Sequence, residues 1–354
     1  MSNIFKSSYK PFLVAGPCSI ENQRQLQAIV DALLDDGRIS MVRGGVWKPR
    51  THPGGFEGLG ETALQWISEL KQERPLLRFC CEVAHPHHVE LCLRYGIDAI
   101  WIGARTTGDP FSMGELCMAL RGCQIPVMVK NPTTPDIQLW IGAIERVMAT
   151  GNSDIAAIHR GFFTSNNLGY RNNPSWEIPM ELKRIMPDLP LLCDPSHIGG
   201  HRELIPQLMQ TAMDLHFDGL MVEVHTQPEA ALTDARQQLS PSMFFAAVDH
   251  LILRSADDIQ NTNLTLLRQQ IDTIDRQILE NLKARTDVSR RIAQIKQENN
   301  MTVFQPKRWE TVLEKDLALA RELGLDDRFV KELFEKIHAE SVRVQEEALN
   351  GDKH

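Results

Sequence analysis

GLMVEVH (Gly219–His225) is a short apolar segment that ends in charged and polar residues, and seven earlier segments have the same character. They are FLVAGPC (Phe12–Cys18), MVRGGVWKPR (Met41–Arg50), RFCCEV (Arg78–Val83), AIWIGAR (Ala99–Arg105), PVMVKNP (Pro126–Pro132), IAAIHRG (Ile155–Gly161) and LLCDPSH (Leu191–His197). Buried parallel strands read as continuous apolar runs, and amphipathic, helix-like stretches separate these eight. Eight strands that alternate with helices predict an α/β fold, the (β/α)8 TIM barrel, whose active site lies at the C-terminal ends of the strands.

Composition narrows the class of protein and its partners. The chain has 354 residues, a length typical of about two domains, and 42% of them are hydrophobic. A net charge of −8 argues against nucleic acid or an anionic membrane as a partner. We find no signal peptide and no apolar run of about 18 residues, and the seven scattered cysteines lack a zinc or disulfide spacing. We therefore expect a cytoplasmic location, where thiols stay reduced.

The pattern changes near residue 255, which predicts a barrel over 1–254, a linker over 255–263 and an all-α, three-helix domain over 264–350. Apolar residues then recur every three or four positions, which predicts one long helix. They are Leu267, Ile271, Ile274, Ile278, Val288, Ile292 and Ile295. A helix of this length exceeds what a small domain can bury, so we expect it to pack against another chain. A second helix should begin at Pro306 and end near Gly324, and a third should begin after Asp326 or Asp327.

Cations gather at or just beyond the predicted strand ends. They are Arg43, Lys48, Arg50, Arg105, Lys130 and Arg160. Six cations around one opening repel one another unless anions lie among them. Arg and Lys placed in this way hold phosphate and carboxylate groups, so two phosphorylated reactants are indicated. Any single one of the six could instead be a solvated loop residue.

Four residues with metal-ligand chemistry follow neighbouring strands. Cys18 ends strand one, His197 ends strand seven, Glu223 ends strand eight, and Asp234 lies in the loop after it. Strands one, seven and eight are adjacent in a closed barrel, so these side chains can converge on a divalent transition metal. Cys18 alone would be read as a core residue. Asp194 and His225 stay open as residues that orient the ligands.

These residues resemble a known family. AGPCS (Ala15–Ser19), RGGVWKPRT (Arg43–Thr51), GART (Gly103–Thr106), DPSH (Asp194–His197) and EVH (Glu223–His225) with the later Asp234 are similar to 3-deoxy-D-arabino-heptulosonate 7-phosphate (DAHP) synthases. The resemblance implies that Arg105, Lys130 and Arg160 bind phosphoenolpyruvate with help from Arg43 and Lys48. It implies that Lys48, Pro49, Arg50 and Thr51 bind erythrose 4-phosphate. It also implies a metal, with Mn²⁺ most expected and Fe²⁺, Co²⁺ or Zn²⁺ left open, on Cys18, His197, Glu223 and Asp234.

The implied reaction is a condensation of phosphoenolpyruvate with erythrose 4-phosphate that yields DAHP and phosphate. The metal would polarise the aldehyde oxygen, and Lys48 would protonate the new alkoxide. An alternative is a different sugar acceptor, as in the octulosonate phosphate and sialic acid synthases. The KPRT motif (Lys48–Thr51) argues against that alternative.

The helical domain carries a second set of polar residues. Arg285 occupies an apolar seam, where a guanidinium needs an anion, and Lys296 lies on nearly the same face 11 residues later. Ser341 and Gln345 interrupt the apolar stripe of the third helix, and polar groups on a core face need a partner. A buried polar network that sets register is the alternative to a ligand site.

This domain resembles the all-helical chorismate mutases, which convert chorismate to prephenate. The matching residues, which the resemblance implies bind chorismate, are Arg268, Arg285, Lys296, Arg308, Ser341 and Gln345. The resemblance implies that Lys296 and Gln345 act on the ether oxygen while Arg285 and Arg268 bind carboxylates. Trp309 and Gln305 stand where the family often has Glu and Asp.

Spacing along the long helix predicts the oligomeric state. Arg268 and Arg285 are 17 residues apart, or about 25 Å along a continuous helix, so one small ligand cannot contact both within a chain. We therefore expect a homodimer formed by the helical domain, with higher assembly left open. We also expect prephenate to inhibit the barrel. The alternative is that the helical domain only senses a ligand and dimerises, without catalysis.

Overall fold

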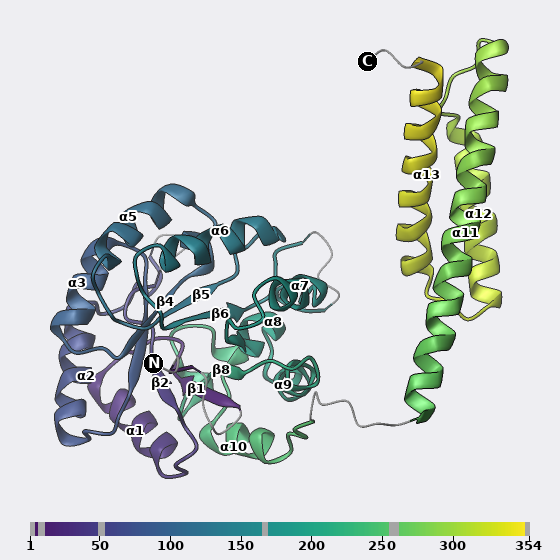
Figure 1. Cartoon of the computed structure of the whole chain (residues 1–354). Helices are drawn as coiled ribbons and strands as arrows, with labels where there is room; N and C mark the ends of the chain where they lie inside the picture. The colour runs from purple at the N-terminus through teal and green to yellow at the C-terminus, as the bar shows by residue number, and fades with distance from the viewer. Residues whose placement is uncertain (1–3, 6–10, 49–53, 165–168, 255–261, 351–354) are drawn as a thin grey trace. The chain divides into compact units, whose positions relative to one another are not determined.

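The structure is a computed structural model that describes residues 4–5, 11–48, 54–164, 169–254 and 262–350 (Figure 1). The chain divides into two compact units, Met1–Ala256 and Asp257–His354, which are described separately below. Residues 255–261 of the predicted linker lie outside the described residues, and helix α11 begins at Thr262, within the last residues of that linker. Among the described helices, none is both long and apolar enough to cross a membrane.

The first unit is a closed barrel of parallel strands, in which each strand pairs with the next and β8 pairs with β1. The strands are β1 (Phe12–Gly16), β2 (Met41–Arg43), β3 (Phe79–Val83), β4 (Ala99–Ile102), β5 (Val127–Lys130), β6 (Ile155–His159), β7 (Leu191–Cys193) and β8 (Gly219–Glu223). The predicted (β/α)8 fold is confirmed. Some polar residues of the predicted segments, among them Arg43, Lys130 and Glu223, are the last residues of their strands. Others, such as Cys18, Arg105 and His197, lie beyond the strand ends.

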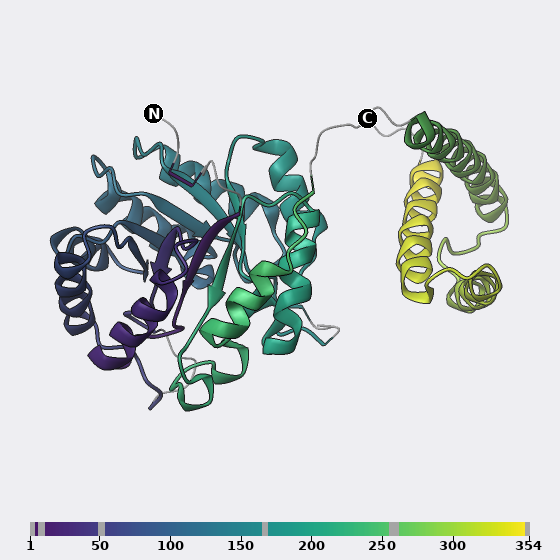
Figure 2. The same ribbon diagram turned by 90° about the horizontal axis from the view of Figure 1, so that it is seen from below.

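Helices surround the strands on the outside (Figures 1 and 2). They are α1 (Gln23–Leu34), α2 (Glu61–Glu73), α3 (Pro86–Arg94), α5 (Pro110–Leu120), α6 (Ile137–Met148), α7 (Glu177–Ile185), α9 (Ile205–Asp214) and α10 (Pro241–Asp249). Two short helices, α4 (Ala104–Thr107) and α8 (Pro195–Gly199), follow β4 and β7 directly. The buried residues of α1, among them Leu26, Ile29, Val30 and Leu33, recur at helical spacing and join the core.

One glycine allows β1 and β2 to approach closely below the site. Gly16 has a φ of +150°, and a Cβ added there would lie 2.1 Å from the carbonyl oxygen of Arg43. Only glycine fits this position. The close approach places the end of β1, which leads to Cys18, beside Arg43.

The described part of the second unit consists of α11 (Thr262–Glu298), α12 (Pro306–Glu322) and α13 (Asp327–Asn350). The predicted helix start at Pro306 is confirmed, and Gly324 follows α12 with a φ of +72°. Helix α13 packs against both α11 and α12. Every side chain of α11 from Leu264 to Asn281 is exposed, so the apolar residues of this half of the amphipathic helix stay accessible among the described residues.

Candidate active sites

A cavity of about 610 Å³ opens at the C-terminal ends of the barrel strands. The charged and ligand-type residues of its wall are Cys18, Lys48, Glu82, Arg105, Lys130, Arg160, Arg171, His197 and Asp234. All except Glu82 and Arg171 are predicted site residues. The polar strand ends of the sequence therefore lie around one cavity.

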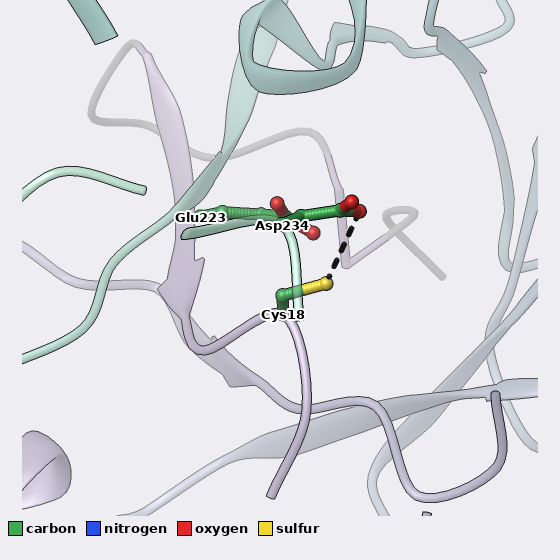
Figure 3. A group of neighbouring side chains, drawn as sticks. All are labelled: Cys18, Glu223 and Asp234. Carbon is green, nitrogen blue, oxygen red and sulfur yellow. Dashed lines mark hydrogen bonds between the residues drawn. The ribbon is translucent and has the colours of Figure 1, made fainter. Parts of the chain in front are cut away.

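Three of the predicted metal ligands meet at one side of this cavity (Figure 3). The Sγ of Cys18 and one carboxylate oxygen each of Glu223 and Asp234 all lie within 4.8 Å of one another. Cys18 Sγ is 3.5 Å from Asp234 Oδ2. His197, the fourth predicted ligand, places Nε2 3.8 Å from Glu223 Oε1. The pairing of β8 with both β1 and β7 brings these residues to one place.

The chemistry of this group fits a divalent metal. Burial, followed by the negative charge of Glu223, raises the pKa of the Cys18 thiol to about 12. A cation among these groups would oppose that effect, because a coordinating thiol is deprotonated. Burial lowers the pKa of His197 and thus favours the neutral imidazole that metals bind. Thiolate, imidazole and carboxylate together suit manganese, iron, cobalt or zinc.

Asp194 contacts two of the predicted site residues. Its Oδ2 lies 2.8 Å from His197 Nδ1 and 2.7 Å from Lys130 Nζ. Burial opposes the charged form of Asp194, but His197 and Lys130 outweigh burial and hold its pKa well below the usual value. The carboxylate therefore engages Nδ1 of His197 and leaves Nε2 for the side of Glu223. His225 instead accepts a hydrogen bond from the backbone N–H of Gln227, at 2.9 Å.

Acidic side chains of the protein lie among the predicted cations. Lys130 Nζ is 2.7 Å from Asp194 Oδ2, and Arg43 Nη2 is 3.1 Å from Glu223 Oε1. Lys48 Nζ instead donates to Cys18 Sγ at 3.0 Å. Part of the charge balance is therefore internal, beside the substrate anions that the sequence indicates. Arg43 is buried against the face of Trp101, 4.9 Å from the ring centroid. Its Nε and Nη1 have no hydrogen-bond partner among the described residues.

Arg160 follows β6 and is held by two asparagines. Its Nη1 donates to Asn172 Oδ1 at 2.9 Å, and its backbone N–H donates to Asn131 Oδ1 at 2.7 Å. Burial lowers the pKa of Arg160 to about 10, which still leaves it charged near neutral pH. Arg105 lies in α4 and is exposed on the cavity wall. The predicted Pro49, Arg50 and Thr51 lie outside the described residues.

Sequence reasoning missed several residues that hold the site together. Arg171 lies 3.2 Å from Asp234 through Nη1 and Oδ1, and Gln237 donates to Glu223 Oε2 at 2.6 Å. Gln238 accepts a hydrogen bond from the backbone N–H of Cys18, at 3.0 Å. These residues come from long loops, where no periodicity indicates which side chains turn inward. The one available signal is the pair of adjacent glutamines shortly after Asp234 in an otherwise polar loop.

The second unit brings together four of the six predicted mutase residues. Arg285 donates to the Ser341 hydroxyl and, at 3.4 Å, to the Ile337 carbonyl. Lys296 donates to Gln345 Oε1 at 3.0 Å, and Gln345 donates to the Ser341 carbonyl at 3.1 Å. Burial lowers the pKa of Lys296. Arg285 and Lys296 thus lie on α11 and face Ser341 and Gln345 of α13. These are the two polar residues that interrupt the apolar stripe of the third helix in the sequence.

The remaining two predicted residues lie elsewhere. Arg268 is on the exposed half of α11, 17 residues from Arg285 on one unbroken helix, and Arg308 is exposed on α12. Trp309 packs its ring 4.1 Å from the ring of His338. Burial, with the charges of Arg285 and Lys296 adding to it, lowers the pKa of His338. Within a single chain, therefore, these helices form only part of the predicted ligand set.

Comparison with known families matches each unit separately. Residues 3–253 match the model of the DAHP synthetase I family, and residues 267–346 match the model of chorismate mutase type II.

Individual relatives agree with these matches. A phospho-2-dehydro-3-deoxyheptonate aldolase of Thermotoga maritima is 30% identical over 239 residues, covering 68% of this chain and 68% of the relative. A crystal structure of a DAHP synthase from Thermotoga maritima superposes with a TM-score of 0.60 and 31% identity, over 68% of this chain and 67% of that one. A bifunctional chorismate mutase/prephenate dehydratase of Buchnera aphidicola is 33% identical over 89 residues, covering 25% of this chain and 23% of the relative. A 2-dehydro-3-deoxyphosphooctonate aldolase of Syntrophotalea carbinolica is 25% identical over 257 residues, covering 66% of this chain and 87% of the relative.

Proposed function

The chain belongs to the DAHP synthetase I family and carries a type II chorismate mutase domain at its C-terminal end, and from this premise we propose how each site works. It is a bifunctional enzyme of the shikimate pathway, with DAHP synthase activity in the barrel and chorismate mutase activity in the helical unit. The sensor-only alternative for the helical unit is therefore set aside. The residues, the metal and the coupling described below are our proposals.

In the barrel, carbon 3 of phosphoenolpyruvate forms a bond to the aldehyde carbon of erythrose 4-phosphate. Water adds at carbon 2, and the bond from that carbon to the phosphate oxygen breaks, which releases phosphate. Lys130, Arg160 and Arg105 hold the phosphate and carboxylate of phosphoenolpyruvate, because all three line the cavity. Two nitrogens of Arg43 also lack a protein partner among the described residues, which supports a contribution from Arg43.

Lys48 is the residue that gives a proton to the new alkoxide. It lines the cavity and contacts Cys18, so its ammonium group lies beside the proposed metal ligands. The neighbouring Pro49, Arg50 and Thr51 bind erythrose 4-phosphate with Lys48, a proposal that rests on the sequence motif. The observation that carries the barrel's function is the convergence of cations and metal-type ligands on one cavity.

Cys18, His197, Glu223 and Asp234 would hold a divalent metal, with Mn²⁺ most expected. When bound, such a metal supplies Lewis-acid polarisation of the aldehyde oxygen. Asp194 keeps the imidazole of His197 oriented, and Gln237 keeps one oxygen of Glu223 occupied.

The acceptor test separates this function from that of the octulosonate relatives. Purified enzyme should form product and phosphate from phosphoenolpyruvate with erythrose 4-phosphate, and should do so far more slowly with arabinose 5-phosphate. Phosphate release with each aldose measures the preference. A higher kcat/KM with arabinose 5-phosphate would contradict the proposed substrate.

Removal of divalent metal should abolish the condensation and spare the mutase. Chelation with EDTA followed by desalting is expected to reduce DAHP formation to background, because no protein residue replaces the metal's Lewis acidity. Addition of Mn²⁺, Fe²⁺, Co²⁺ or Zn²⁺ to parallel samples should restore the rate and rank the metals. Chorismate consumption in the same samples serves as the control. Full condensation activity in metal-free enzyme would refute the metal site.

In the helical unit, chorismate rearranges to prephenate as its ether C–O bond breaks and a C–C bond forms. Lys296 and Gln345 contact the ether oxygen, where negative charge develops, and Arg285 binds a carboxylate. The clustering of these residues with Ser341 supports this assignment. Arg308 and the Arg268 of a second copy complete the binding of the dianion.

The second copy comes from a homodimer formed through α11. The exposed residues Leu267, Ile271, Ile274 and Ile278 share one face of the N-terminal half of that helix. Arg268 lies on the same half and is about 25 Å from Arg285 within one chain. Dimerisation would thus bury the apolar face of α11 and at the same time bring the Arg268 of one copy to the mutase site of the other.

A charged residue placed in this apolar face of α11 should dissociate the dimer and lower the mutase activity. Ile271→Asp is expected to give a monomer by size-exclusion chromatography with light scattering, and to lower mutase kcat/KM by about 10²-fold, because the partner's cation is lost. Gln269→Asp, which adds the same charge about half a turn away, is the control and should leave both unchanged. A monomeric Ile271→Asp variant with normal mutase activity would exclude a site shared between copies.

We also propose that prephenate bound to the helical unit inhibits the barrel. An effector can act only if it binds two states unequally, and typical coupling changes affinity by about 5- to 150-fold. Saturating prephenate should therefore raise the KM for phosphoenolpyruvate by about five-fold or more. A full-length enzyme whose condensation rate ignores saturating prephenate would eliminate the regulatory role.

The seven cysteines are unpaired, and the sulfurs of Cys81 and Cys92 lie 3.3 Å apart without a bond. We propose a cytoplasmic location, because the spacing of the cysteines in the sequence fits no disulfide framework.

A further inference from the structure

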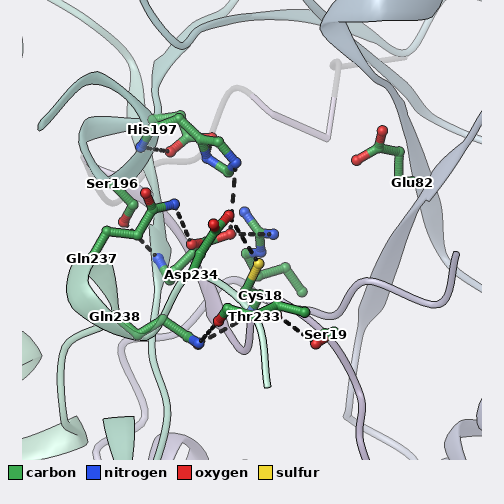
Figure 4. A network of polar contacts seen from close by, with 12 residues as sticks. Cys18, Ser19, Glu82, Ser196, His197, Thr233, Asp234, Gln237 and Gln238 are labelled. Carbon is green, nitrogen blue, oxygen red and sulfur yellow. Dashed lines mark hydrogen bonds and ion pairs between the residues drawn. The ribbon is translucent and has the colours of Figure 1, made fainter. Parts of the chain in front are cut away.

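Two adjacent buried glutamines lie in the loop after β8, beside the proposed metal ligands (Figure 4). Gln237 is 1% exposed and Gln238 is 0% exposed, although glutamine is mostly a surface residue. A buried amide needs partners for both its oxygen and its nitrogen. Most of these partners belong to the ligand-bearing segments, and the exception is Arg171, which itself contacts Asp234.

Gln237 joins the two ligand carboxylates through one further residue. Its Nε2 donates to Glu223 Oε2 at 2.6 Å, and its Oε1 accepts a hydrogen bond from Arg171 Nη1. The same Arg171 nitrogen lies 3.2 Å from Asp234 Oδ1. With Oε2 of Glu223 occupied by the amide, Oε1 is the oxygen that faces His197. One amide and one guanidinium therefore link the two carboxylates, while Arg43 Nη2 donates to the other oxygen of Glu223 at 3.1 Å.

Gln238 performs the corresponding task for the cysteine. Its Oε1 accepts a hydrogen bond from the backbone N–H of Cys18 at 3.0 Å, and its Nε2 donates to the Thr233 carbonyl at 2.8 Å. Thr233 precedes Asp234, and its hydroxyl lies 2.6 Å from that of Ser19. The loop that follows β1 is thereby tied to the loop that carries Asp234.

Backbone geometry shows why Asp234 needs such support. It has a φ of +47°, in the left-handed region that a non-glycine residue adopts at a cost. In addition, two carboxylates and a sulfur gathered in one place repel one another when charged. Donors from Gln237 and Arg171 oppose this repulsion.

We propose that Gln237, Gln238 and Arg171 are positioning residues that hold Cys18, Glu223 and Asp234 in a ligand-ready arrangement before the metal binds. This inference rests on the proposed metal site. Preorganisation of this kind raises metal affinity, because binding no longer includes the cost of gathering the ligands. None of the three residues coordinates the metal itself.

The test is a manganese titration of metal-free enzyme, in which electron paramagnetic resonance reports free Mn²⁺. Gln237→Met keeps the size of the side chain and removes both hydrogen bonds, and it should weaken Mn²⁺ binding by about 10- to 100-fold. Arg171→Met changes an exposed side chain, and it should weaken binding in the same direction. Condensation activity should recover in both variants as Mn²⁺ is raised.

Asn152→Leu is the matched control. Asn152 is a buried amide in the loop before β6, where it donates to the Ile125 carbonyl and accepts from the backbone N–H of Asp154. This variant should lower the unfolding midpoint of the metal-free enzyme without changing Mn²⁺ affinity. If Asn152→Leu weakens Mn²⁺ binding as much as Gln237→Met, or if neither Gln237→Met nor Arg171→Met weakens it, the inference fails.

The wild-type titration separates this inference from the proposed metal site. If wild-type enzyme binds no Mn²⁺, the metal site itself is wrong. If wild-type enzyme binds Mn²⁺ and the Gln237→Met and Arg171→Met variants bind it equally well, the metal site stands and only the positioning role is wrong.

Discussion

Replacement of Cys18 by alanine is expected to lower the rate of DAHP formation by about 10³-fold or more and to leave the mutase rate unchanged. Cys18 lies at the end of β1, 3.5 Å from Asp234 and 3.0 Å from Lys48, and it offers the sulfur of the proposed ligand set. Loss of a metal's Lewis acidity removes several kcal/mol of transition-state stabilisation, and each tenfold in rate corresponds to about 1.4 kcal/mol. Bound metal, measured after dialysis, should fall together with the rate.

The control for this variant is Cys123→Ala. Cys123 is also a free thiol, but it follows α5 on the outside of the barrel, where its Sγ contacts the Ala119 carbonyl. Its removal should change neither the metal content nor either activity. If Cys18→Ala retains both wild-type metal content and wild-type condensation, the cysteine is a core residue after all, as its burial alone would suggest.

The position of Cys18 also shows what could be predicted from the sequence. The apolar runs identify the strands, and the barrel topology places the ends of strands one, seven and eight side by side. The order of the strands in the barrel is therefore enough to predict that Cys18, His197 and Glu223 lie close together. Asp194 stayed open because a residue that contacts His197 within one loop has no distinguishing pattern in the sequence.

The parts that escaped prediction are contacts between long loops. Gln237 and Arg171 meet although 66 residues separate them, and no hydrophobic period spans that interval. That acidic side chains face the cations was not predicted from the sequence either. Glu223 and Asp194 each pair with a cation, so repulsion among the cations is weaker than their number suggests.

In the helical unit, the spacing of apolar and polar residues predicted which helix faces pack together, but it did not predict which groups bond to each other across them. The seam position of Arg285 indicates that it needs an acceptor. In the structure that acceptor is the Ser341 hydroxyl together with the Ile337 carbonyl. Neither group carries a full negative charge, so the guanidinium keeps its ability to bind an anionic ligand.

Arg285→Ala should therefore remove the mutase activity and spare the condensation. The loss of one cation that stabilises a bound dianion and its transition state is expected to lower mutase kcat/KM by about 10²- to 10³-fold. Chorismate disappearance measures the mutase, and phosphate release from phosphoenolpyruvate measures the barrel in the same preparation. Arg285 is half-buried against α13, so circular dichroism should confirm that the helices persist.

Arg290→Ala is the matched control for that variant. Arg290 lies on the same helix, is exposed, and pairs with Asp287 at 2.9 Å, so its loss removes an equal charge at a distance from the Arg285, Ser341 and Gln345 cluster. Exposed pairs of this kind contribute little to stability, and we expect both activities to stay within about two-fold of wild type. Equal losses of mutase activity in the two variants would mean that net charge, and not the position of Arg285, determines the rate. A selective loss in Arg285→Ala would instead assign the carboxylate contact to Arg285, because the two changes differ only in where the cation lies.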